Sequence, residues 1–182
     1  QCQFAFYFQA VKNRRDILGS DWEDFDFLRQ ETFKGALNRY PDFSPKIAER
    51  INKELELIQQ KGFVSYFLIN YDIVNFAHSK GYYHVGRGSG ANSIVAYCLY
   101  ITDVDPIELD LYFERFINLY RENPPDFDID FSWTDRDEVT AYIFEKYNQG
   151  NEEHVALLGS YSTFQSNSML RELGKVFGLP KT

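Results

Sequence analysis

Cysteine and histidine are scarce in this sequence of 182 residues, and their positions show no pattern of metal ligands. The two cysteines, Cys2 and Cys98, have neither the spacing of a metal site nor that of a disulfide framework. Cys98 lies in an apolar run, where a buried, reduced thiol is expected. We expect core or surface roles for the three scattered histidines, His78, His84 and His154.

The sequence also lacks a signal peptide, an apolar run of transmembrane length and any internal repeat. We therefore expect a cytoplasmic protein with no membrane partner. Positive charge is in the minority, with 19 Lys and Arg against 27 Asp and Glu. Nucleic-acid-binding domains are usually basic, so a polyanionic partner would have to be held by a local patch or through bound metal ions.

Apolar residues, by contrast, are abundant. Hydrophobic residues make up 44% of the chain and aromatic residues 18%, which excludes a disordered chain and allows one domain with a sizeable core. Helical and extended patterns alternate, which predicts an α+β (mixed α/β) fold. The expected elements are helices ending at Pro41, Gly62 and Gly81, a helix beginning near Ala91, a helix capped by Thr134 and a strand at 154–158. A last helix is expected within residues 164–180, with Gly178 and Pro180 beyond its end.

The segment GRGSGANS, residues 86–93, is the first place where chemistry could reside. Glycines let backbone N–H groups converge on an anion, and a helix N-terminus just beyond them adds partial positive charge. Arg87 and Ser89 add a charged fork and a hydroxyl donor. The pattern is neither a Walker motif nor GxGxxG, so an anion site and a plain serine-capped glycine turn are both open.

The segment PDFDIDF, residues 125–131, is the second such place, with Asp126, Asp128 and Asp130 at alternate positions. Period two predicts a half-buried strand that carries its carboxylates on one face. Like charges at this spacing repel, so a cation is expected beside them. Mg²⁺ prefers carboxylate oxygens together with substrate phosphate oxygens, which favours a divalent-cation site. The alternative is a solvated edge strand whose charges discourage aggregation.

Together the two segments describe a nucleotidyltransferase palm, in which the glycine turn holds a triphosphate and the aspartates hold metal ions. Four segments then resemble a known family, in its order and over roughly residues 25–180: ELELIQQKGFVSYFLI, GRGSGANSIVAYCLYITDVDPIELDLYFERFIN, PPDFDIDF and LRELGKVFGLP. The family is that of the catalytic α subunit of bacterial DNA polymerase III, the C-family replicative polymerase.

This resemblance implies a partial polymerase-beta-like nucleotidyltransferase palm with flanking helices. Residues 1–157 would form the palm, and residues 158–182 would begin the helical thumb. The family's metal-binding pair falls on Asp126 and Asp128, with Asp130 in a supporting position or as a further metal ligand. Its triphosphate-binding positions fall on four residues, Arg87, Gly88, Ser89 and Arg115.

The resemblance also implies the activity of the parent protein, which is template-directed DNA synthesis in replication. The primer 3′-hydroxyl would attack a bound deoxynucleoside triphosphate with the help of two Mg²⁺ ions. Magnesium, and not a cationic side chain of the protein, would neutralise the aspartates. The implied partners are primer–template DNA, deoxynucleoside triphosphates and, through parts outside this chain, a sliding clamp and a clamp loader. The family's third carboxylate lies beyond this chain, so we expect the fragment alone to be inactive.

Two functions other than template-directed DNA synthesis are also compatible with the sequence. A template-independent nucleotidyltransferase would need its third carboxylate within the chain, where Asp135, Asp137 and Glu138 are the candidates. Their position at the start of a helix favours a role in the first turn instead. A non-catalytic, polymerase-like interaction module is the other alternative, and the presence of both metal-site aspartates, Arg87 and Ser89 disfavours it.

Overall fold

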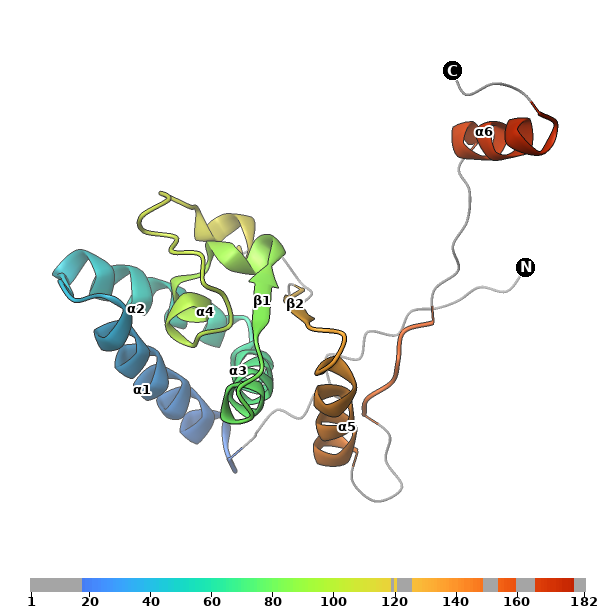
Figure 1. Cartoon of the computed structure of the whole chain (residues 1–182). Coiled ribbons are helices and arrows are strands. Elements are labelled where there is room, and N and C mark those ends of the chain that lie inside the picture. The colour runs from blue at the N-terminus through green and yellow to red at the C-terminus, as the bar shows by residue number, and fades with distance from the viewer. Residues whose placement is uncertain (1–17, 119, 121–125, 149–153, 160–165, 179–182) are drawn as a thin grey trace.

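The computed structural model describes residues 18–118, 120, 126–148, 154–159 and 166–178. Helices dominate this part of the chain, and the described strands form one two-stranded antiparallel sheet (Figure 1). The mixed α+β class is therefore confirmed at this coarse level. No helix in the described residues combines the length and the apolar composition that a membrane crossing requires. The elements are α1 (Asp21–Arg39), α2 (Pro45–Gln60), α3 (Val64–Ser79), β1 (His84–Arg87), the 3-10 helix η1 (Gly88–Asn92), α4 (Ile94–Cys98), the 3-10 helix η2 (Phe113–Arg115), β2 (Asp128–Phe131), α5 (Arg136–Tyr147) and α6 (Ser166–Val176).

The predicted ends of the first three helices are confirmed, and α2 also begins at a local sequence signal. The Ser44 side chain accepts a hydrogen bond from the Ile47 amide, and Pro45 occupies the first turn of α2. Gly62 and Gly81 follow the C-caps of α2 and α3 with φ angles of +69° and +74°. Only glycine adopts this left-handed conformation readily, so each helix ends there.

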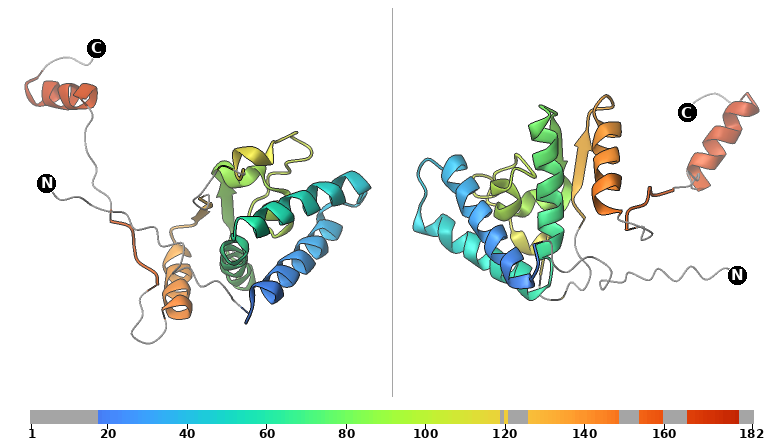
Figure 2. Two further views of the ribbon diagram at one scale, coloured as in Figure 1. Left: turned by 180° about the vertical axis from the view of Figure 1, so that it is seen from behind. Right: turned by 90° about the horizontal axis from the view of Figure 1, so that it is seen from below.

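The hydrophobic core lies among α1, α2, α3 and the short, largely buried α4 (Figures 1 and 2). Its largest fully buried side chains include Phe67, Phe113 and Phe116. The backbones of α1 and α4 almost touch, because a Cβ atom built on Gly35 would lie 1.9 Å from the carbonyl oxygen of Cys98. This close approach fixes the segment that follows the glycine turn against the helical core.

The two strands bring the distant sequence segments together. In the register of the sheet, Gly86 lies opposite Ile129 and Arg87 lies opposite Asp128. Ile129 and Phe127 pack against the core, while Asp130 is exposed. The alternation of PDFDIDF therefore produces a half-buried strand, as the period-two pattern predicts.

The helix after the glycine turn differs from the prediction. It does not begin near Ala91: residues 88–92 tighten into η1, and α4 begins at Ile94. The Ser93 side chain caps α4 by accepting a hydrogen bond from the Ala96 amide at 3.1 Å. The serine cap thus starts the helix three residues later, and α4 is only five residues long.

Two further predictions near the C-terminal end are wrong. Thr134 does not cap α5; the amides of Asp135 and Arg136 both donate to the Ser132 carbonyl, so a turn precedes the helix and Asp135 is its N-cap. Residues 154–159 form no strand, because the amides of His154 and Val155 donate to the Asn148 side chain instead of to a neighbouring strand. The helix predicted over 164–180 is confirmed as α6 within its described residues.

Candidate functional site

At each glycine of the GRGSG turn, an added side chain would meet a neighbouring residue. A Cβ atom on Gly86 would lie 1.8 Å from the carbonyl oxygen of Ile101. Gly88 has a φ angle of +76°, and its Cβ would lie 2.6 Å from the Asp128 carboxylate. A Cβ on Gly90 would lie 2.6 Å from the Phe127 ring. The turn therefore needs glycine for close packing as well as for backbone conformation.

The same contacts bring β2 directly against the turn. The carboxylate of Asp128 lies beside Gly88, and the Phe127 ring lies beside Gly90. The Phe127 ring also packs against Phe67 and Phe116 of the core, with centroid distances of 5.1 Å and 5.0 Å. Two segments some forty residues apart thus meet at one place, one carrying glycine amides and the other carrying carboxylates.

Arg87 bridges two of the three aspartates. Its Nε and Nη2 donate to the two carboxylate oxygens of Asp130 at 2.5 Å and 3.2 Å, and its Nη1 donates to Asp128 Oδ2 at 3.3 Å. The hydrogen bond and charge of the guanidinium hold the pKa of Asp130 below its ordinary value, and Asp130 raises the pKa of Arg87. The cation beside the acidic face is therefore the guanidinium of Arg87, whereas magnesium was expected there from the sequence. An ion pair as exposed as this one is readily exchanged for another partner.

The remaining predicted residues lie on neighbouring elements. Asp126 is exposed and directly precedes Phe127 and β2. Ser89 lies in η1, where its carbonyl accepts a hydrogen bond from the Asn92 side chain at 2.9 Å. Arg115 is exposed at the end of η2, a helix in contact with η1. The structure thus brings Arg87, Gly88 and Asp128 together and carries Ser89 and Arg115 on adjoining helices.

A charged pair behind the turn, with Glu54 buried and Arg50 partly exposed, was not predicted from the sequence. Glu54 of α2 has no exposed surface, and its Oε1 accepts a hydrogen bond from Arg50 Nε at 2.7 Å. Its Oε2 accepts from Ser93 Oγ at 2.9 Å and from the Val95 amide at 3.4 Å. Burial raises the pKa of Glu54 to about 7, against the opposing effects of Arg50 and Ser93. The sequence feature that could have revealed Glu54 is its place on the apolar stripe of α2, three residues after Ile51.

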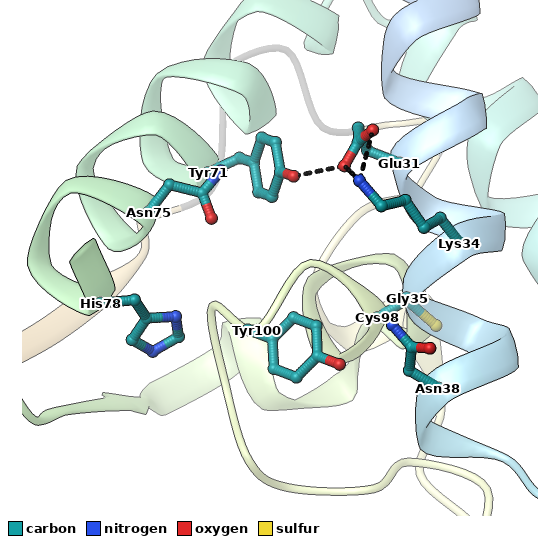
Figure 3. Close-up of a pocket in the computed structure, with 9 residues that line it drawn as sticks. All are labelled: Glu31, Lys34, Gly35, Asn38, Tyr71, Asn75, His78, Cys98 and Tyr100. Carbon is teal, nitrogen blue, oxygen red and sulfur yellow. Dashed lines mark hydrogen bonds and ion pairs between the residues drawn. The ribbon is translucent and has the colours of Figure 1, made fainter. Parts of the chain in front are cut away.

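A cavity of about 310 Å³ between α1 and α3 is separate from these residues (Figure 3). Tyr71 and Tyr100 face its interior, and Tyr71 donates a hydrogen bond to Glu31, which also pairs with Lys34. Burial, with help from Glu31, raises the pKa of Tyr71 to about 12. His78 and Cys98 line this cavity, but none of the predicted metal-binding or phosphate-binding residues does.

The donor set at β2 is compatible with Mg²⁺. Among the described residues, no three His, Cys, Asp or Glu side chains are grouped so that they could hold a metal ion by themselves. Mg²⁺ does not require such a cage, because one or two carboxylates suffice when water and phosphate oxygens complete the coordination. Asp126 and Asp128 offer two such carboxylates, and Asp128 lies beside the turn.

Comparison with known proteins shows similarity to a polymerase family, both in a family model and in individual relatives. The model of the bacterial DNA polymerase III alpha NTPase domain matches residues 26–182. An error-prone DNA polymerase of Symbiobacterium thermophilum is 47% identical over 152 residues, which cover 84% of this chain and 14% of that protein. One from Bordetella parapertussis is 44% identical over 180 residues, which cover 98% of this chain and 17% of that protein. The chain therefore spans only a small part of the length of these relatives.

Proposed function

The chain belongs to the family of the bacterial DNA polymerase III alpha NTPase domain, and on this premise we propose that it forms the metal- and nucleotide-binding part of a DNA-directed DNA polymerase. The observation that carries this proposal is the contact of the Asp128 carboxylate with Gly88, which puts a metal-type ligand beside a turn suited to phosphate. Because the relatives are named error-prone DNA polymerases, we assign the parent protein to that kind.

In this proposal residues 1–157 belong to a polymerase-beta-like palm and residues 158–182 begin the thumb. The parent protein binds primer–template DNA and deoxynucleoside triphosphates in the bacterial cytoplasm. It meets a sliding clamp and a clamp loader through parts outside this chain. The acidic net charge agrees with this arrangement, because most duplex contacts would be made elsewhere in the protein.

The side chains have distinct roles in the proposed reaction. Asp126 and Asp128 would hold Mg²⁺ ions, which when bound supply activation of the primer 3′-hydroxyl and stabilisation of the leaving pyrophosphate. Gly88 lets the backbone approach a phosphate, and the hydroxyl of Ser89 donates a hydrogen bond to it. The third carboxylate required for turnover would come from beyond Thr182, so the 182-residue chain alone is expected to be inactive.

Arg87 would exchange partners when nucleotide binds. Its exposed ion pairs with Asp130 and Asp128 hold the guanidinium beside the turn. From there it can leave the carboxylates and bind a triphosphate. Phosphate oxygens present the same paired acceptors as a carboxylate, so the exchange keeps the planar fork satisfied. Arg115 would add a second positive charge from η2.

Replacing Arg87 by alanine should therefore raise the KM for nucleotide by roughly 10- to 150-fold, corresponding to a charge-assisted contact of about 1.5–3 kcal/mol. Steady-state incorporation by the full-length polymerase on a primed template measures this effect, and Arg87→Lys should fall between the wild type and alanine. Arg136→Ala is the matched control, because Arg136 also forms an exposed ion pair, with Asp137. An unchanged KM in Arg87→Ala would refute the phosphate role of Arg87.

The same assay separates the two alternatives. Incorporation that proceeds equally well without a template would identify a template-independent nucleotidyltransferase. No incorporation by the full-length wild-type protein would favour the non-catalytic interaction module.

A further inference from the structure

We propose that Glu54, together with Arg50, is a positioning residue that holds the rear of the glycine turn and thereby sets its affinity for nucleotide. The first half of this inference, that the pair positions the turn, does not depend on any ligand. The second half, that it sets nucleotide affinity, rests on the proposed function. Neither residue lies in the glycine turn or in the aspartate strand, although Glu54 begins the segment ELELIQQKGFVSYFLI. Neither is placed in contact with substrate.

The hydrogen bonds of the pair converge on the last residues of the turn. Glu54 accepts from the side chain of Ser93 and from the Val95 amide, directly after η1. Arg50 Nη2 donates to the carbonyl of Asn92, the last residue of η1, at 3.4 Å. These bonds link α2 to the far end of the turn, across about forty residues of sequence.

Arg50 extends the same network toward η2. Its Nη2 also donates to the carbonyl of Leu111 at 3.0 Å, two residues before η2 begins. The segment that carries Arg115 is therefore bonded to the same ion pair as the turn that carries Arg87 and Ser89. This one pair positions both sources of proposed phosphate contacts.

The turn is consequently held from two sides. On one side β2 packs against Gly88 and Gly90, and on the other Glu54 and Arg50 fix the residues that follow. A buried ion pair seldom improves stability over apolar residues of similar volume. A carboxylate with no exposed surface on the apolar stripe of α2 is therefore better explained by the position that it imposes than by stability.

The test compares Glu54→Gln with Glu56→Gln in the full-length polymerase. The two substitutions make the same chemical change on α2, but Glu56 is exposed. Hydrogen–deuterium exchange over residues 88–96 is measured first, since it needs no activity. We expect about 10-fold faster exchange in Glu54→Gln, because glutamine cannot accept from both Ser93 and the Val95 amide while it bonds Arg50. Glu56→Gln should match the wild type.

Nucleotide kinetics then test the second half of the inference. Glu54→Gln should raise the KM for nucleotide about 10-fold with kcat changed less than about threefold, because the turn binds substrate and transition state alike. A purely structural role would instead lower the apparent kcat through a smaller folded fraction and leave KM unchanged. Ser93→Ala, which keeps the charge of Glu54, provides a second variant if Glu54→Gln folds poorly, and it should change exchange and KM in the same direction.

The outcomes separate the inference from the function on which it rests. Unchanged exchange over residues 88–96 in both variants overturns the positioning role, whatever the kinetics. Faster exchange with an unchanged KM overturns the second half of the inference, because the pair then does not set the affinity of the turn for nucleotide. Faster exchange with no incorporation by the wild type upholds the contact with the turn and refutes the proposed polymerase activity.

Discussion

Replacing Asp128 by asparagine in the full-length polymerase is expected to lower kcat for nucleotide incorporation by about 1,000-fold or more. Asparagine retains the size of the side chain beside Gly88 but removes the negative charge with which the carboxylate would attract Mg²⁺. The expected loss corresponds to several kcal/mol of transition-state stabilisation, the typical contribution of a bound catalytic metal. Asp126→Asn should have a similar effect. Single-turnover incorporation on a primed template measures both, and DNA binding should remain nearly unchanged.

Asp130→Asn is the matched comparison, since it makes the same change two residues further along β2. Asp130 is held by Arg87, and the family resemblance assigns it no certain ligand role. Its substitution should therefore reduce turnover much less than that of either other aspartate. If Asp130→Asn proved the most damaging while Asp126→Asn stayed active, the metal site would lie one step further along the strand than we propose.

Replacing Gly35 by alanine should lower the free energy of unfolding by about 3 kcal/mol or more. Helix propensity alone favours alanine over glycine by roughly 1 kcal/mol. The new Cβ, however, would lie 1.9 Å from the Cys98 carbonyl oxygen, so the backbones of α1 and α4 must separate. Overpacking of this kind costs about 1–3 kcal/mol or more, and here the obstacle is backbone rather than a movable side chain.

Urea denaturation of the 182-residue chain measures this effect. Gly62→Ala is the control, because no atom lies within 4 Å of the new Cβ and only its φ of +69° opposes the change. That substitution should cost about 1–2 kcal/mol. A Gly35→Ala chain as stable as the wild type would contradict the close contact of α1 with α4.

The sequence predicted best those features that depend on neighbouring residues. Ser44, Pro45 and Gly62 bound α2 by local chemistry, so its limits were predictable. The alternation in PDFDIDF likewise predicted a half-buried strand. The start of α4 also follows a local signal, the Ser93 cap, which was overlooked. The bond from Ser93 to Glu54 was not predictable, because Glu54 lies 39 positions earlier in the chain.

The candidate site was predictable in its residue types but not in its pairings. The motif supplied Arg87 and Asp128, and the structure brings both to the glycine turn. The bidentate contact of Arg87 with Asp130 depends on the register of β1 against β2, which no local pattern specifies. The strand expected at 154–158 failed for a related reason, since an extended pattern forms a strand only beside a partner.

The most direct test of the metal site is the affinity of the full-length polymerase for Mn²⁺, a hard divalent ion that accepts the same oxygen ligands as Mg²⁺. Isothermal titration calorimetry, with a non-hydrolysable deoxynucleoside triphosphate present, compares the wild type with Asp126→Asn, Asp128→Asn and Asp130→Asn. We predict that the first two substitutions weaken Mn²⁺ binding by at least about 10-fold, which corresponds to about 1.4 kcal/mol, whereas Asp130→Asn changes it little. Wild-type affinity in both Asp126→Asn and Asp128→Asn would contradict the assignment of these two carboxylates as the metal ligands.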